Sequence, residues 1–243
     1  MQVMQLGNGG GFDFNSVSSS FIVRHEGHYV LVDCGFNVLN KLKSISLEDE
    51  IDYLKNIHTV CITHHHEDHI GNLMSLVYYR YFTYGLQTTI MAGEETTRDW
   101  LRNYLSPCQS ELKSGLVVLA EMARIVRVSG IYGCLSIQAL PANHAVIASC
   151  GYSFTPIAPA KFPERLVAIT GDTKAYYKLE EKLGYLVENE GTDLTIFHDY
   201  SNWDNVSSNV HACATDIGTE YSEEFRKALT FYHDNKPFTR QWL

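Results

Sequence analysis

Hydrophobic and polar positions follow one another along the chain in short segments, and each segment predicts one strand or one helix. Runs rich in β-branched and aromatic residues, bounded by turn residues, predict strands. These runs are 1–6, 19–24, 28–33, 59–62, 87–91, 124–128, 135–140, 149–154, 166–170 and 194–197. Hydrophobic residues at helical spacing predict helices over 36–56, 72–79, 94–104, 176–186 and 219–232, while 108–122 fits a helix or irregular structure. The mixture of strands and helices indicates an α/β protein.

Two local signals refine this pattern. Glu26-Gly27 separates the second and third predicted strands and predicts a hairpin turn. Ser46 is followed three residues later by Asp49, which fits a capping box inside 36–56. We therefore expect two helices there.

The strongest chemical signal follows the predicted strand 59–62, where His64, His66, Asp68 and His69 lie within six positions. On extended backbone, residues two apart point to the same side, so His64 and His66 should face together and His65 away. Asp68 and His69 fall at the turn into the next helix and could serve a second metal ion. Imidazole and carboxylate ligands suit zinc, manganese or iron. A chance cluster of histidines is the alternative, but the spacing favours a metal site. We expect His65 and Glu67 to be exposed loop residues.

Further candidate residues follow other predicted strands. His144, Asp172 and His198 each lie just beyond the carboxyl end of a strand, and His211 lies in the loop after the last of these. A single histidine of this kind is more often structural than functional. Because strand ends can meet at one edge of a sheet, their shared position favours one common site.

Composition narrows the class of protein. With 243 residues and 45% hydrophobic residues, the chain suits a single domain spanning 1–243 with a large core. The net charge is −9 and Lys and Arg form no run, so we expect no long nucleic acid as partner. No hydrophobic run is long enough to span a membrane, and the N-terminus does not resemble a signal peptide. The scattered cysteines are typical of reduced thiols, which predicts a cytoplasmic protein; Cys213 could be a ligand, but a packed thiol is favoured.

Taken together, the order His-x-His-x-Asp-His, a later His, Asp in Gly-Asp-Thr and a final His resembles the metallo-β-lactamase fold. The resemblance is nearest to its phosphodiesterase branch, which includes the tRNA-processing ribonuclease Z. Asp33-Cys34-Gly35 and the Ser-Cys-Gly-Tyr of 149–152 extend it over most of the chain. It implies an αββα sandwich of two mixed sheets flanked by helices.

The same resemblance implies a binuclear metallohydrolase with seven ligands. His64, His66 and His144 would bind one divalent ion, Asp68, His69 and His211 the other, and Asp172 would bridge them. We expect zinc, with manganese as the alternative. Two such ions ~3.5–4 Å apart activate water and clamp both oxygens of a displacement.

Two residues receive proposed catalytic roles. Ribonuclease Z has a His-Glu-Ala-Thr element where this chain reads His198-Asp199-Tyr200-Ser201. We expect His198 to protonate the leaving oxygen; the alternative is that His198 supports a ligand from behind. Asp68 could receive the proton of the attacking water.

The substrate follows by analogy. Ribonuclease Z grips tRNA with a long arm between its lone His and its Gly-Asp-Thr aspartate, whereas His144 and Asp172 are only 28 residues apart here. Relatives without the arm resemble the anti-Pycsar proteins, which hydrolyse cyclic nucleotide monophosphates used as immune signals. This resemblance implies a homodimeric phage anti-defence enzyme, in the host cytoplasm, that opens 3′,5′-cyclic nucleotides such as cyclic CMP or cyclic UMP. The alternatives are a ribonuclease Z-like tRNA or RNA endonuclease, a lactone or thioester hydrolase, and a non-catalytic nucleotide-binding protein.

Overall fold

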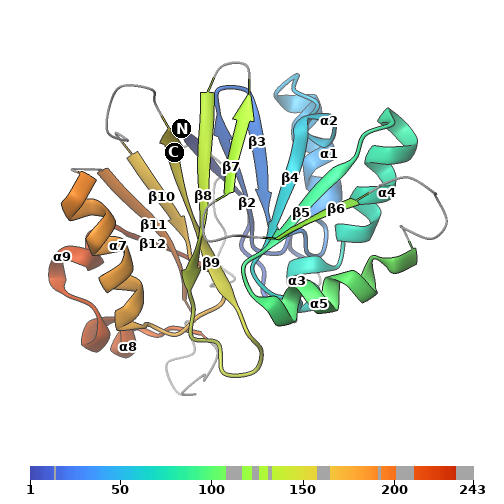
Figure 1. The fold of residues 1–243 in the computed structure, drawn as a ribbon. Coiled ribbons are helices and arrows are strands. Elements are labelled where there is room, and N and C mark those ends of the chain that lie inside the picture. The colour runs from blue at the N-terminus through green and yellow to red at the C-terminus, as the bar shows by residue number, and fades with distance from the viewer. Residues whose placement is uncertain are drawn as a thin grey trace. The chain divides into compact units, whose positions relative to one another are not determined.

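The computed structural model describes residues 1–13, 15–107, 117–121, 126–130, 133–157, 165–190, 193–200 and 211–233. The chain divides into two compact units, Met1–Glu121 and Met122–Asp234 (Figure 1). Each unit contains one six-stranded sheet with its own helices. The prediction of a single domain over 1–243 stays a prediction. No helix within these described ranges is both long and apolar enough to cross a membrane.

The sheet of the first unit has the strand order β1-β2-β3-β4-β5-β6. Its strands are β1 (Gln2–Gly7), β2 (Ser20–His25), β3 (His28–Val32), β4 (Ile57–Ile62), β5 (Thr88–Ala92) and β6 (Val117–Glu121). The first three strands are antiparallel, and β3 to β6 are parallel. The predicted hairpin is present: Glu26 and Gly27 both have positive φ, 45° and 83°, as a tight two-residue turn requires.

Helices of the first unit join its parallel strands. They are α1 (Val38–Glu48), α2 (Tyr53–Asn56), α3 (Glu67–Ile70), α4 (Leu73–Tyr84) and α5 (Glu95–Tyr104). The predicted split of 36–56 into two helices is confirmed, but its cap is a different residue. Asp52 caps α2 by accepting a hydrogen bond from the backbone N–H of Lys55, whereas Ser46 lies inside α1 and donates to the carbonyl of Leu42.

The sheet of the second unit has the order β12-β11-β10-β9-β8-β7. Its elements are β7 (Val126–Gly130), β8 (Gly133–Pro141), β9 (Cys150–Ile157), β10 (Arg165–Ile169), α7 (Tyr177–Glu190), β11 (Asp193–Asp199), α8 (Ala214–Glu220), α9 (Glu223–Arg226) and β12 (Leu229–Tyr232). Strands β8, β9 and β10 alternate in direction, and β10, β11 and β12 are parallel. The carboxyl ends of β8, β10, β11 and β12 therefore share one edge of the sheet.

The expectation of a helix over 219–232 is wrong. The segment contains the end of α8, the whole of α9 and then β12, which pairs in parallel with β11 from Ile196↔Leu229 to Asp199↔Tyr232. Hydrophobic residues at helical spacing, such as Tyr221 and Phe225, pack into the core of this unit and produced the misleading pattern. Because a helix was expected here, the residue that follows β12 did not stand out as a strand-end residue.

Candidate metal centre

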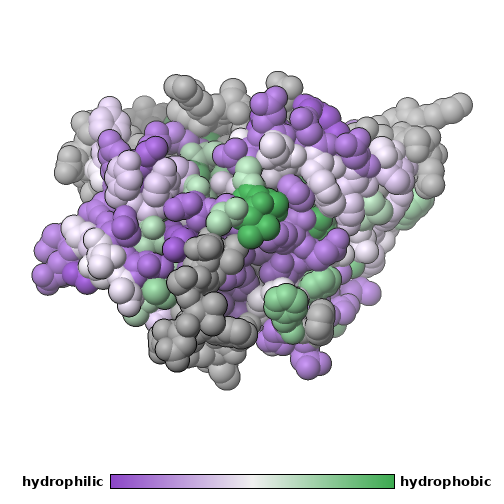
Figure 2. All heavy atoms as spheres, turned by 90° about the horizontal axis from the view of Figure 1, so that it is seen from below, coloured by the Kyte–Doolittle hydropathy of each residue, from purple (hydrophilic) through white to green (hydrophobic). Residues whose placement is uncertain are grey.

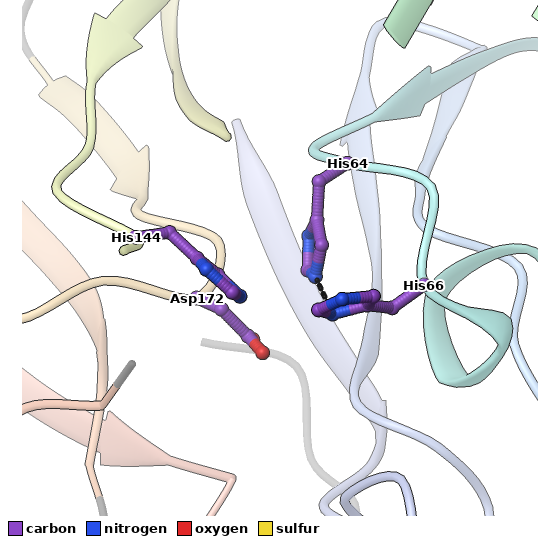
Figure 3. Close-up of side chains that lie close together, drawn as sticks. All are labelled: His64, His66, His144 and Asp172. Atoms are coloured by element: carbon purple, nitrogen blue, oxygen red, sulfur yellow. Dashed lines mark hydrogen bonds between the residues drawn. The ribbon is translucent and has the colours of Figure 1, made fainter. Parts of the chain in front are cut away.

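The first set of candidate ligands lies where the buried strand β4 ends. Figure 3 shows the rings of His64 and His66 meeting edge-on, with Nε2 of His64 3.0 Å from Nδ1 of His66 and 77° between the ring planes. The two residues face the same side, as alternation along extended backbone requires. His64 and His69 are almost fully buried, at 0% and 1% exposure, and their ring centroids are 4.1 Å apart. Oδ2 of Asp68 lies 3.5 Å from Nε2 of His69. One loop and one helical turn thus gather three imidazoles and a carboxylate.

Asp33, which follows β3, orients two of these imidazoles. Its carboxylate accepts hydrogen bonds from the backbone N–H of Thr63 and the hydroxyl of Thr63, both at 2.8 Å. It also lies 2.8 Å from Nδ1 of His69, and the Thr63 oxygen lies 3.0 Å from Nδ1 of His64. Because the Thr63 hydroxyl donates to Asp33, its oxygen accepts from His64. Both histidines therefore carry the proton on Nδ1 and present the lone pair of Nε2.

Gly35 lets the segment after β3 approach the ligand helix α3 closely. A Cβ at Gly35 would lie only 1.7 Å from the backbone oxygen of Asp68. The backbone N–H of Cys34 donates to the carbonyl of His69 at 2.7 Å, and that of Asn72 donates to the carbonyl of Cys34 at 2.8 Å. The motif Asp33-Cys34-Gly35 thus fixes α3 through both its carboxylate and its backbone.

The second set of candidate ligands lies along the shared strand edge of the other unit. His144 follows β8, and Asp172 follows β10 after Gly171, whose φ of 66° turns the chain. Figure 3 shows the side chains of His144 and Asp172 next to each other. Their two loops are joined by a hydrogen bond of 2.8 Å from the backbone N–H of Asn143 to the hydroxyl of Thr173.

The same edge also holds Asp199, His211 and His233. Nδ1 of His211 lies 2.8 Å from Oδ2 of Asp199 and 3.8 Å from Asp172. Nδ1 of His233 lies 3.1 Å from Asp172 and 3.2 Å from Asp199. Donor atoms of Asp172, Asp199, His211 and His233 all lie within 4.8 Å of one another. Sequence reasoning missed His233, although it follows a strand as His144 and Asp172 do.

The carboxylates of this cluster change the pKa of His211. Burial lowers the pKa of its imidazole, but the hydrogen bond and charge of Asp199, together with the charge of Asp172, outweigh burial. The pKa of His211 therefore lies above its usual value. Asp199 itself is fully buried and also accepts a hydrogen bond of 2.9 Å from the backbone N–H of Thr173.

Comparison with known protein families shows which family the chain belongs to. A family model described as "Anti-Pycsar protein Apyc1" matches residues 1–241. The chain belongs to this family. The fold of this anti-Pycsar family member is the metallo-β-lactamase fold, as predicted, with two mixed sheets and flanking helices.

Individual proteins are similar to this anti-Pycsar family member in sequence or in fold. A ribonuclease Z of Metallosphaera sedula is 30% identical over 112 residues, which are 44% of this chain and 37% of that protein. The chain thus aligns with only about a third of the length of its curated relatives. Yeast PDE1 superimposes with a TM-score of 0.70 at 16% identity, covering 96% of this chain and 87% of that one. The metallo-β-lactamase fold protein YhfI of Bacillus subtilis has a TM-score of 0.64 at 19% identity, covering 98% and 88%.

His198 does not join the candidate ligands. It is fully buried, its Nδ1 lies 2.6 Å from the backbone oxygen of Asp199, and its Nε2 lies 2.8 Å from the hydroxyl of Tyr221. Burial, opposed by Asp199, lowers the pKa of His198. A neutral ring with both nitrogens engaged inside the core is not placed to protonate a substrate. The role of His198, as acid or as support for a ligand, stays a prediction.

The expected exposure is confirmed for Glu67, although Glu67 begins α3 instead of lying in a loop, and it is wrong for His65. Glu67 is exposed, whereas His65 is half-buried and stacks on Trp100. Cys213 lies in none of the candidate ligand groups found among the described residues.

The donor atoms of this anti-Pycsar family member fit divalent cations. They are imidazole nitrogens and carboxylate oxygens, the ligands that zinc and manganese take in hydrolases. Asp33 behind His69 reproduces the carboxylate–histidine arrangement that orients ligands in zinc sites. The identity of the metal stays a prediction.

Proposed function

We propose that this protein is a binuclear metallohydrolase that opens a 3′,5′-cyclic nucleotide to the mononucleotide. The observation that carries this proposal is the match of the anti-Pycsar family over residues 1–241, on a chain that retains two sets of imidazole and carboxylate donors. The short interval between His144 and Asp172 and the net charge of −9 favour a small phosphodiester over a long nucleic acid. Figure 2 shows hydrophilic residues over much of the face seen from below.

The proposed ligand set keeps most of the assignment that the resemblance to the metallo-β-lactamase fold implies. His64, His66 and His144 would hold one ion, Asp68 and His69 would hold the other, and Asp172 would be shared by both. For the seventh ligand we propose His233 instead of His211. His233 follows β12 at the edge where Asp172 follows β10, and its imidazole nitrogen lies 3.1 Å from the Asp172 carboxylate.

His211 then takes the acid role expected of His198. Asp199 holds Nδ1 of His211 at 2.8 Å, which fixes the tautomer and orients the ring so that Nε2 can carry a proton to a substrate. When bound, two divalent ions supply an activated water and neutralise charge on the phosphoryl oxygens. Water adds to phosphorus and gives up a proton, for which Asp68 is the proposed acceptor; the bond from phosphorus to the 3′ oxygen breaks, and His211 gives its proton to that oxygen.

A panel of substrates tests this function. Zinc- or manganese-loaded protein is incubated with cyclic mononucleotides, cyclic dinucleotides, linear dinucleotides, a tRNA precursor and a lactone, and products are separated by chromatography. We expect hydrolysis of cyclic mononucleotides to mononucleotides. Hydrolysis confined to the tRNA precursor, or to the lactone, would overturn the proposal. Binding of cyclic nucleotides without turnover would select a non-catalytic binding protein.

A ribonuclease Z-like nuclease is the second candidate. The similarity to the Metallosphaera sedula ribonuclease Z favours it. Such an enzyme would bind RNA through phosphate contacts, so its affinity would fall steeply with salt concentration. The homodimer and the cytoplasmic location expected from the sequence stay predictions.

A further inference from the structure

His65 lies between two proposed ligands and makes contacts of its own. Its ring stacks on Trp100 of α5, with 5.0 Å between ring centroids and 15° between ring planes. Its Nδ1 lies 3.4 Å from the hydroxyl of Thr97, which is fully buried in the same helix. The His65 ring is therefore held by two residues one turn apart on α5.

The stack continues beyond Trp100. The Trp100 ring stacks on Tyr104, with centroids 4.7 Å apart and 22° between planes. The helix α5 directly follows β5, and β5 pairs in parallel with β4, the strand that precedes the ligand loop. The helix that carries these rings therefore begins beside that loop. Offset aromatic stacking stabilises such a column beyond the burial of its rings, which favours one conformation of a short loop.

Backbone geometry connects this stack to the ligands. His64 and His66 face one side of the segment and His65 faces the other. Fixing the His65 ring on α5 therefore restricts the backbone torsions on both sides of residue 65, and these torsions aim the neighbouring imidazoles. The carbonyl of His66 is also tied to α3, because the N–H groups of His69 and Ile70 donate to it at 2.9 Å and 3.1 Å.

We propose that His65 is a positioning residue, whose stack on Trp100 preorganises His64 and His66 to bind a divalent cation. This inference rests on the proposed metal site. The aromatic ring carries the effect, so another flat ring can replace the imidazole. A ligand loop held in advance loses less conformational freedom when the ion binds.

Zinc affinity tests this role without reference to catalysis. Metal-free protein is titrated with zinc against a chromophoric chelator for wild type, His65→Ala, His65→Phe and Trp100→Ala. We expect His65→Ala and Trp100→Ala each to weaken the tighter site 10- to 100-fold, the range for residues that orient ligands. His65→Phe should stay within about threefold of wild type, because it retains the stack.

A matched control separates positioning from general stability. Phe82→Ala removes a ring that stacks on Tyr78 of α4, at 6.0 Å and 20°, and it should leave zinc affinity unchanged. Thermal unfolding of the metal-free variants shows whether the fold is retained. The visible spectrum of the cobalt-substituted protein should change in His65→Ala and be restored in His65→Phe.

The outcomes distinguish this inference from the proposed function. If wild type binds zinc and His65→Ala binds it equally well, or if His65→Phe is as weak as His65→Ala, the positioning role is wrong and the metal site stands. If wild type binds no zinc or manganese, both proposals fall.

Discussion

Replacing Asp33 with Asn should disable two histidine ligands while leaving each of them in the chain. In the wild type, Oδ1 of Asp33 accepts from the backbone N–H of Thr63, and Oδ2 faces the Thr63 hydroxyl and Nδ1 of His69, all at 2.8 Å. A backbone N–H can only donate, so in Asp33→Asn the oxygen of the new amide must keep the first position. The NH₂ group then faces Thr63 and His69 and can only donate to them.

This reversal propagates to the metal-binding nitrogens. Nδ1 of His69 must accept, which moves the proton to Nε2 and blocks it as a ligand. The Thr63 hydroxyl, which no longer donates to residue 33, turns toward Nδ1 of His64 and favours the same change there. Loss of one orienting partner typically weakens metal binding 10- to 100-fold. With two ligands affected we expect the upper end, about 100-fold, or about 2.8 kcal/mol.

The assay is competition with a chromophoric chelator, with metal content after dialysis measured by mass spectrometry. Asp49→Asn is the matched control. It removes one carboxylate from the same unit, where Asp49 accepts from the hydroxyl of Tyr53 at 2.7 Å. If Asp33→Asn, with native circular dichroism, retains zinc within about threefold of Asp49→Asn, the tautomer argument is refuted, since even one lost orienting partner costs about tenfold.

Other predictions concern the seventh metal ligand, the proton donor, the dependence of activity on metal, and the stability of the core. His233→Ala should lose about one ion per chain by elemental analysis, whereas His211→Ala should keep both and lose about 10²–10⁴-fold in turnover; the reverse result would restore His211 as the ligand. Chelator should abolish hydrolysis and zinc or manganese should restore it; activity that survives in metal-free protein would contradict the site. Arg80→Met should lower the free energy of unfolding by about 3 kcal/mol or more in urea, because fully buried Arg80 donates to the carbonyls of Leu54, Lys55 and Gln87. Arg102→Met, on a half-exposed side chain, should change it by less than about 0.5 kcal/mol.

Local patterns predicted the first half of the site because its geometry is local. The hydrophobic run before Thr63 marked β4, and alternation placed His64 and His66 on one side. Asp33 was recognised only as part of a motif. Its bonds to Thr63 and His69 join positions 30 and 36 residues apart, and no local pattern specifies such a pairing.

In the second half of the site, the position of one strand end decides which side chain reaches the ligand cluster. The sequence predicted a strand over 194–197, which left His198 at the edge. The observed β11 extends to Asp199, and because side chains alternate, His198 turns into the core towards Tyr221 while Asp199 reaches the ligand cluster.

His233 was missed for a related reason. Leu229–Tyr232 is a four-residue strand that exists through parallel pairing with β11, a partner about thirty residues earlier in the chain. Tyr221, Phe225 and Leu229 repeat at helical spacing and outweigh so short a β signal. The residue after Tyr232 therefore did not stand out as a strand-end histidine.

The most direct test of the central claim follows the phosphorus atom itself. Zinc-loaded protein is mixed with cyclic CMP or cyclic UMP in ¹⁸O-enriched water, and the reaction is followed by ³¹P NMR. The account predicts that the cyclic diester signal is replaced by that of the 5′-mononucleotide with one ¹⁸O on phosphorus, and that chelator stops the conversion. Cyclic nucleotides that remain intact, while the same sample cleaves a tRNA precursor, would contradict it.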